Sequence, residues 1–390
     1  MNNTHRITLL AFLTYFVMSA MLTPIGIISI PMAEHFGQSV PEVTRQFSWL
    51  TGGILVGAVV ALMIYDFAGL RQVFLGTYGV MTLALLSLMV LDSLTMVSLS
   101  LGIVGTGCGI GLAGAAIVIS LTYDENRRAS MLVLTDSCFS IAGFVAASFT
   151  TFLIARNFGW STTYQMLALV TVTIIGLAIL SLFPRTSTEQ AGESSASPWP
   201  FPVWLCVISL FLYTLGQYAI LFWLPSYAMT ALTADEGAAG NLVGQFWLGM
   251  FLAQLFAAWW VLKIGVRKLV LIGSITTCIA TIPLWTVADI SHLTLLALVW
   301  GFMNLAMLKA ILAFATEMVA IPSPRLVSLM LLGATVGTAV SPAVTSQVVE
   351  WTDTRTVLMF GTGCYALLFC LMTSARLLDQ SERPPVIGSS

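Results

Sequence analysis

The chain has 390 residues, of which 58% are hydrophobic and only 8% are charged, and its net charge is −2. Soluble domains carry about 25% charged residues, so this composition excludes an ordinary soluble protein, and the mean hydropathy of +0.95 indicates a membrane protein. The near-zero net charge gives no sign of a nucleic acid partner. The six cysteines occur singly, without the paired spacing of a disulfide framework or a zinc site.

Twelve apolar stretches are long enough to cross a bilayer as helices of about 20 residues. The expected spans are 8–30, 46–66, 73–91, 97–121, 130–154, 162–183, 201–230, 239–262, 268–288, 293–316, 326–349 and 356–375. The first stretch is too long for a signal peptide and lacks a convincing cleavage site, so we expect it to be a true span.

A Ser- and Pro-rich segment, 184–200, separates the sixth span from the seventh. It has the composition of a flexible linker. The expected organisation is an N-terminal six-helix half (1–183), this cytoplasmic linker, a C-terminal six-helix half (201–376) and a cytoplasmic tail (377–390).

The positions of lysine and arginine indicate the orientation of the chain. With both termini in the cytoplasm, eleven of the fifteen basic residues lie on the cytoplasmic side, three lie outside, and Lys309 lies within the tenth span. An odd number of spans would destroy this asymmetry. We therefore expect an even number of spans with both ends cytoplasmic.

Two loops at corresponding places in the two halves carry a similar motif. The loop after the second span, "YDFAGLRQVF", contains Asp66, Gly69 and Arg71. The equivalent loop of the second half, "LKIGVRKLV", contains the corresponding glycine and basic residues but has a leucine in place of the acid. Those residues are Gly265, Arg267 and Lys268. Basic residues alone could be topology anchors, but this would not explain the glycines.

The repeated loop resembles the loop motif of the major facilitator superfamily, in which such residues latch helices on the cytoplasmic side. Longer strings, "LVLTDSCFSIAG" (132–143), "FLIARNFGW" (152–160), "LGQYAILFWLPSY" (215–227) and "IPSPRLVSLMLLGATVGT" (321–338), resemble the TsgA family within it. The resemblance implies an all-α fold of twelve transmembrane helices in two pseudo-symmetric halves, located in the bacterial inner membrane. It also implies ties to fucose and glucose proton symporters. The chain departs from the family at Lys309, a position that is not typically basic there.

Ionisable groups inside membrane spans are functional candidates because burying them is costly. Asp136 lies about 9 Å into the expected fifth span and Lys309 about 12 Å from the end of the tenth, at 1.5 Å per residue. The fifth and tenth helices approach each other in the superfamily, so the two residues could form a gate pair that couples transport to protons. Alternatively, Lys309 could receive a negative charge of the solute or snorkel toward the interface, and Asp136 could bond local backbone.

Amides and aromatic rings within spans suggest a hydroxylated solute, because rings stack on sugars and amides bond hydroxyls. The candidate solute-binding residues are Tyr213, Gln217, Gln245, Trp300 and Asn304. Structural roles compete with this interpretation, since amides also join helices and tryptophans form interfacial belts.

The expected function is proton-coupled secondary transport of a small polar solute, and a sugar-like solute is favoured. The transporter is expected to be a monomer that needs no cofactor or metal. Export of an organic anion or toxic compound is an alternative, and so is a non-transporting receptor on the same fold. An enzyme is disfavoured because the three histidines, His5, His35 and His292, lie in tails or short loops, and no metalloprotease or phosphate-loop motif occurs. A channel is disfavoured because no filter or pore ring is recognisable.

Overall fold

The computed structural model describes residues 2–184, 199–319 and 324–379. Every described element is helical. The elements are α1 (Asn3–Leu22), α2 (Ile25–Phe36), α3 (Val40–Phe67), α4 (Leu70–Ser87), α5 (Leu94–Thr122), α6 (Glu125–Ala155), α7 (Thr162–Leu180), α8 (Phe201–Ala231), α9 (Glu236–Ile264), α10 (Val266–Thr281), the 3₁₀ turn η1 (Ile282–Trp285), α11 (Ile290–Met303), α12 (Met307–Glu317), α13 (Pro324–Trp351) and α14 (Thr354–Leu378).

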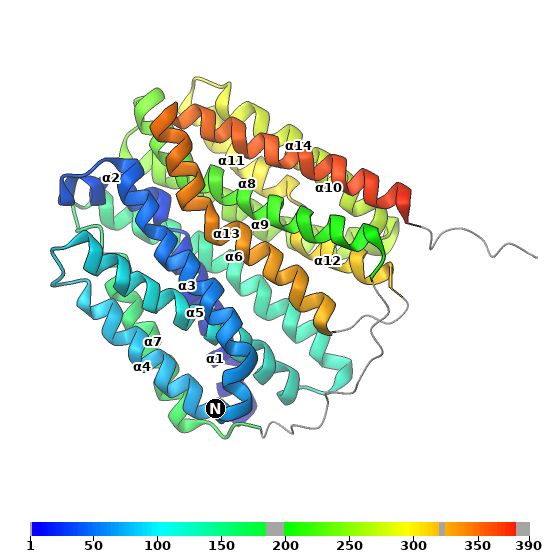
Figure 1. Cartoon of the computed structure of the whole chain (residues 1–390). Helices are drawn as coiled ribbons and strands as arrows, with labels where there is room; N and C mark the ends of the chain where they lie inside the picture. The colour runs from blue at the N-terminus through cyan, green and yellow to red at the C-terminus, as the bar shows by residue number, and fades with distance from the viewer. Residues whose placement is uncertain (1, 185–198, 320–323, 380–390) are drawn as a thin grey trace, which may run out of the picture.

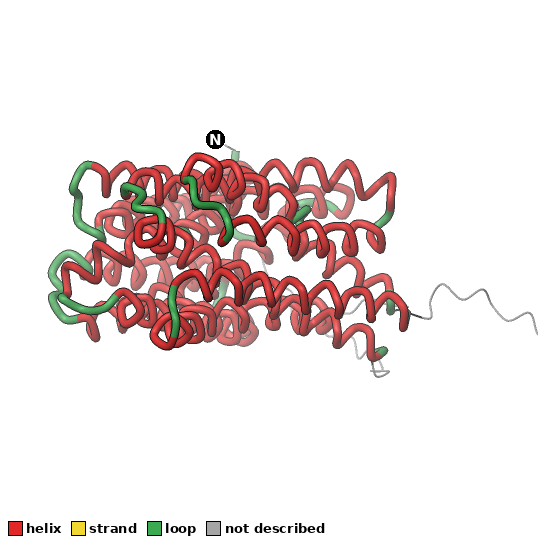
Figure 2. Tube along the Cα trace, turned by 90° about the horizontal axis from the view of Figure 1, so that it is seen from above, coloured by secondary structure: helices red, strands yellow, loops and turns green. Residues whose placement is uncertain are grey.

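These elements form twelve candidate membrane spans within the described part of the chain. The expected all-α fold of two six-helix halves is confirmed: α1–α7 form the N-terminal half and α8–α14 the C-terminal half, side by side (Figure 1). Seen from above, the helices run roughly parallel in stacked layers (Figure 2). Most of the expected linker, 185–198, and the last residues of the tail, 380–390, lie outside the described residues.

Small residues allow close helix packing within each half. A side-chain carbon at Gly109 in α5 would lie 2.6 Å from the backbone nitrogen of Ala58 in α3, so only glycine fits there. The same holds in the C-terminal half, where a side-chain carbon at Gly249 in α9 would lie 2.9 Å from the nitrogen of Phe302 in α11. Without a hydrophobic force between helices in lipid, such close backbone approach supplies the van der Waals contact.

Two spans that were expected to be continuous are broken. The first runs from α1 into α2 across Thr23 and Pro24, and Pro24 cannot donate a backbone hydrogen bond to the preceding turn. The tenth is divided into α11 and α12, with Leu305 and Ala306 in the left-handed region at φ 45° and 54°. The first candidate span is therefore α1, Asn3–Leu22, rather than 8–30, and α2 is a separate, shorter apolar helix.

The halves are joined at one membrane face, here called the distal face, which is opposite to the face that carries the start of α1 and the end of α14. Arg45 at the start of α3 forms an ion pair with Glu350 at the end of α13. One turn and a half further along α3, the Thr51 hydroxyl donates to the carbonyl of Ala339 at 3.0 Å. At Gly26, α2 packs so closely on α8 that a side-chain carbon would lie 2.5 Å from the carbonyl oxygen of Leu221.

Candidate functional site

A cavity of about 320 Å³ lies between the two halves. Four elements of each half contribute to its wall, namely α1, α3, α5 and α6 from the first and α8, α9, α12 and α13 from the second, with Ala306 from the α11–α12 connection. The lining residues that carry polar groups or aromatic rings are Tyr15, Phe139, Ser140, Tyr213, Thr214, Gln217, Tyr218, Trp247, Gln254, Lys309, Thr335 and Thr338. Because both halves form the wall, a relative movement of the halves would change access to the cavity.

Several polar atoms on this wall are buried without a hydrogen-bond partner among the described residues. They are the Ser140 hydroxyl, the side-chain oxygens of Gln217 and Gln254, and the indole nitrogen of Trp247. The side chains of Gln217 and Trp247 are only 3% and 1% exposed. A buried polar group of this kind is costly unless something bonds it. Polar atoms without a partner among the described residues also occur away from the cavity, for example at Asn304, so it is their position on a wall formed by both halves that makes them candidates for binding.

The structure divides the five expected solute-binding residues into two groups. Tyr213 and Gln217, both on α8, line the cavity. The other three, Gln245, Trp300 and Asn304, are not part of its wall.

Trp300 and Asn304 are fully buried behind that wall. The Trp300 ring lies 4.1 Å from the Phe246 ring between centroids, and the Asn304 amide donates to the Trp300 carbonyl at 3.2 Å. Gln245 donates to Asn241 at 3.3 Å on a more exposed part of α9. Trp300 and Asn304 occupy packing positions in this conformation, which is the structural role that amides and tryptophans often have.

The wall also contains aromatic residues beyond the five candidate solute-binding residues. Tyr15 and Phe139 contribute aromatic rings from the N-terminal half, and Trp247 contributes one from α9. A side-chain carbon at Gly143 in α6 would lie 2.5 Å from the Trp247 ring, so the glycine creates the space for this indole. A glycine in α6 and a tryptophan in α9 do not pair by any sequence pattern, so the contact could be found only in three dimensions.

Lys309 lies in the first turn of α12 and on the cavity wall, as a half-buried residue. Asp136 lies in α6, which begins at Glu125 rather than near 130, so its position is eleven residues from the helix start. The Asp136 side chain lies outside the described residues. Whether these two residues form a pair is therefore a prediction that the structure does not test.

The two loop motifs lie at the ends of helices on the face that carries the chain termini. Gly69 caps α4, and Arg71 donates to the carbonyl of Ile179 near the end of α7 at 2.9 Å. The Asp66 side chain lies outside the described part of the chain. In this half the motif thus ties α4 to α7.

The second copy of the motif joins three helices of the C-terminal half. Gly265 has φ +78°, a conformation that favours glycine, and connects α9 to α10. Arg267 forms ion pairs with Glu317 of α12 at 3.6 Å and with Asp379 beyond α14 at 3.0 Å. Lys268 is exposed. The arginine of this loop therefore holds the ends of α12 and α14 together.

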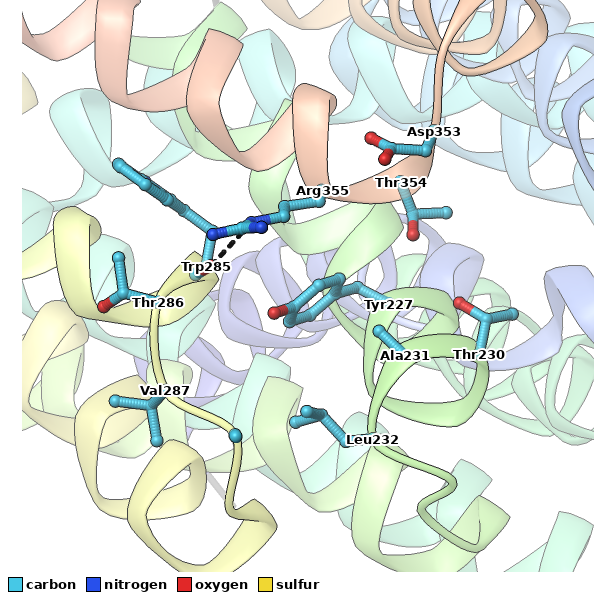
Figure 3. A pocket seen from close by; sticks show the side chains of 11 residues that line it. Tyr227, Thr230, Ala231, Leu232, Trp285, Thr286, Val287, Asp353, Thr354 and Arg355 are labelled. Carbon is cyan, nitrogen blue, oxygen red and sulfur yellow. Dashed lines mark hydrogen bonds between the residues drawn. The ribbon is translucent and has the colours of Figure 1, made fainter.

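A second cavity, of about 430 Å³, opens at the distal face between the end of α8, the η1–α11 connection and the start of α14 (Figure 3). The ring of Tyr227 and the chain of Arg355 reach into it, and the Arg355 guanidinium donates to the carbonyl of Trp285 at 3.0 Å. Only the C-terminal half forms this cavity. It is larger than the central one, but a movement between the halves would not open and close it, so the central cavity is the better candidate for a transport site.

No group of three or more potential metal ligands occurs among the described residues. A binding cavity enclosed between two six-helix halves is the architecture of alternating-access membrane transporters.

The family model of the Major Facilitator Superfamily matches residues 7–231 and 206–389, and the chain belongs to that superfamily. It is 27% identical over 381 residues to a protein TsgA homolog of Yersinia enterocolitica, covering 95% of each chain. It is 26% identical over 375 residues to a protein TsgA homolog of Buchnera aphidicola, covering 95% of this chain and 96% of the relative. The expected superfamily and the resemblance to TsgA proteins are thereby confirmed.

Two crystal structures of the nucleoside transporter NupG have the same fold. They match with TM-scores of 0.76 and 0.72 at 14% sequence identity, and each match covers 96% of this chain. The matches cover 100% and 99% of the two NupG chains. At this identity the likeness concerns the fold alone.

Proposed function

We propose that this protein is a secondary active transporter that moves a small polar, sugar-like solute across the bacterial inner membrane by alternating access, driven by protons. The observation that carries the proposal is the central cavity, which is lined by both halves and whose wall includes Gln217 and Trp247, each with a buried polar atom that has no partner among the described residues. Superfamily membership supports the same class of function.

The transport cycle follows from the way the halves are joined. The contacts Arg45–Glu350 and Thr51–Ala339 connect α3 with α13 at the distal face. Rigid movement of one half against the other would break these contacts and open the cavity at that face. With the termini in the cytoplasm, the described conformation is closed on the periplasmic side.

Proton coupling is assigned to Asp136 together with Lys309. Position 136 lies three and four residues before Phe139 and Ser140, which line the cavity, and residues at this spacing share a helix face. Burial disfavours a charged carboxylate and a nearby cation favours it. Asp136 would accordingly release its proton when Lys309 is available to it and take one up when Lys309 is engaged elsewhere.

Uptake into proteoliposomes tests the transport function. The purified protein is reconstituted, and labelled glucose, glucuronate and uridine are supplied with and without an inwardly directed proton gradient. We expect saturable uptake of at least one solute, enhanced by the gradient, and counterflow exchange without it. Specific binding of a solute without counterflow would instead identify a receptor on the transporter fold.

A further inference from the structure

The break in the tenth span lies at the central cavity. Leu305 and Ala306 both have left-handed backbone conformations, which are unfavourable for residues other than glycine. No proline or glycine in the segment "MNLAML" requires a break there. Irregular backbone at membrane depth is tolerated where it borders a cavity, and such strain concentrates at ligand sites. Ala306 itself lines the cavity, in agreement with this rule.

The break places the N-terminus of α12 at the cavity wall. This end carries the positive pole of the helix dipole, which favours negative charges and disfavours cations. Lys309 nevertheless stands in the first turn of α12, and it is the only charged residue among the described residues of the wall. Two sources of positive potential therefore act together on the cavity wall. An anionic group in the cavity would complement both of them.

The unpartnered polar atoms of the wall are an independent indication of a ligand. The side-chain oxygens of Gln217 and Gln254 are acceptors, so they require donors such as hydroxyl groups. The indole nitrogen of Trp247 can only donate and requires an acceptor. The Trp247 ring also offers an apolar face next to Phe139, at 5.6 Å between centroids. A solute with several hydroxyls and a compact ring satisfies these groups.

We infer that the cavity binds a hydroxylated carboxylic acid of the sugar-acid class, whose carboxylate lies at Lys309 and the start of α12 and whose hydroxyls bond Gln217 and Gln254. The inference rests on the proposed function, because it takes the central cavity as the transport site. A cavity of about 320 Å³ is near the lower end of the ~300–1,000 Å³ usual for small-molecule sites. That size suits one hexose-sized molecule.

The test compares D-glucuronate with D-glucose, which share a ring and differ in the carboxylate. Binding is measured on the purified full-length protein by thermal stabilisation over a concentration series of each compound. We expect glucuronate to stabilise the protein and glucose to do so at least about tenfold less effectively, since a charge-assisted contact is lost. The Lys309→Gln variant should abolish the difference, and Lys309→Arg should retain it. Lys263→Gln, at an exposed lysine in the last turn of α9, is the matched control.

A second variant allows the inference to be tested even if the Lys309→Gln variant does not fold. Gln217→Glu has nearly the same shape and adds a negative charge to the cavity wall on α8, so it should weaken glucuronate binding by about tenfold or more. Equal stabilisation by both sugars, stabilisation by neither, or a preference for glucuronate that survives in Lys309→Gln would overturn the inference. Uptake of glucose without a preference for the acid would overturn it while leaving the transport function intact. Binding of glucuronate without any flux would support the inference and refute transport.

Discussion

The hydroxyl of Thr51 in α3 donates to the backbone carbonyl of Ala339 in α13 at 3.0 Å, and it forms a buried hydrogen bond between the two halves near the distal face. Such a bond exists only in conformations in which that face is closed. This hydrogen bond and the Arg45–Glu350 ion pair both stabilise the conformation that is closed at the distal face. Single substitutions at these contacts should therefore change the fraction of molecules in that conformation.

The Thr51→Val substitution removes the hydroxyl and keeps the shape of the side chain. Hydrogen bonds between membrane helices contribute about 0.6 kcal/mol on average, so the population closed at the distal face should fall about threefold relative to the open one. Spin labels at Gln38 and Thr352, in a background without the native cysteines, would report this as a gain in long distances. Thr173→Val, which removes a hydroxyl that donates to the Leu169 carbonyl within α7, is the control. An unchanged distance distribution would contradict the prediction.

The Gly26→Ala substitution tests the packing of α2 on α8. The added carbon would lie 2.5 Å from the carbonyl oxygen of Leu221 and 2.9 Å from that of Phe222. Backbone atoms cannot yield as a flexible side chain can, so the closed conformation should lose about 1–3 kcal/mol. The thermal midpoint should fall and the same spin-label pair should report opening. Gly76→Ala, where the added carbon meets nothing within 4 Å, should leave both measurements unchanged.

The Arg267→Gln substitution tests the loop of the second half. It removes the ion pairs with Glu317 and Asp379. The side chain of Asp379 is only 5% exposed, so the loss should amount to about 1.5–3 kcal/mol of unfolding free energy. Adding Asp379→Asn should restore part of the loss, because it removes the buried charge left behind. Chemical denaturation of the single and double variants in detergent measures this, and strictly additive losses would refute the coupling.

The start of α14 provides a prediction about pH. Asp353 accepts hydrogen bonds from the hydroxyl and the backbone nitrogen of Thr356, both at 2.7 Å, and these bonds lower its pKa from the ordinary value of 3.8. Because the pKa of Asp353 is lower in the folded state, its ionised carboxylate stabilises the folded protein fully above pH 3.8. This stabilisation is lost as the pH falls through the pKa of the folded state. Asp353→Ala should cost about 1 kcal/mol at neutral pH. The cost should shrink below about pH 4, and a cost that stays the same from about pH 7 to about pH 3 would contradict the prediction.

Much of the architecture was predictable because membrane burial leaves a strong signal in the sequence. Apolar stretches of sufficient length and the distribution of basic residues gave the correct number of spans and their pairing into halves. The broken tenth span was not predictable, since residues 304–306 contain neither proline nor glycine. Its strained backbone is stabilised by tertiary surroundings that local sequence does not reveal.

The cavity wall was only partly predictable for a related reason. Tyr213 and Gln217 lie on a continuous helix, where polar residues at mid-span face the interior, and both line the cavity. Trp300 and Asn304 precede the break and pack against neighbouring helices instead. Tyr15 and Phe139 were missed because an aromatic residue in an apolar span has the same local pattern whether it faces lipid, core or cavity.

Proton coupling is tested most directly at Asp136. An amide at this position keeps the size of the side chain but cannot exchange a proton. The Asp136→Asn variant should lose accumulation of solute against its gradient in proteoliposomes by at least about tenfold, as expected when an essential proton carrier is removed. Counterflow exchange should persist, since movement of the halves with bound solute requires no net proton transfer.

Two comparisons distinguish this role from a structural one. Asp124→Asn, at the start of α6, controls for loss of a carboxylate on the same helix and should preserve accumulation. Under the proposed pairing with Lys309, the double variant Asp136→Asn with Lys309→Gln should be more stable than Lys309→Gln alone, because the double variant leaves no carboxylate without its cation. Proton-driven accumulation that survives in Asp136→Asn would assign the coupling to another group, and the polar atoms of the central cavity would then be the next residues to replace.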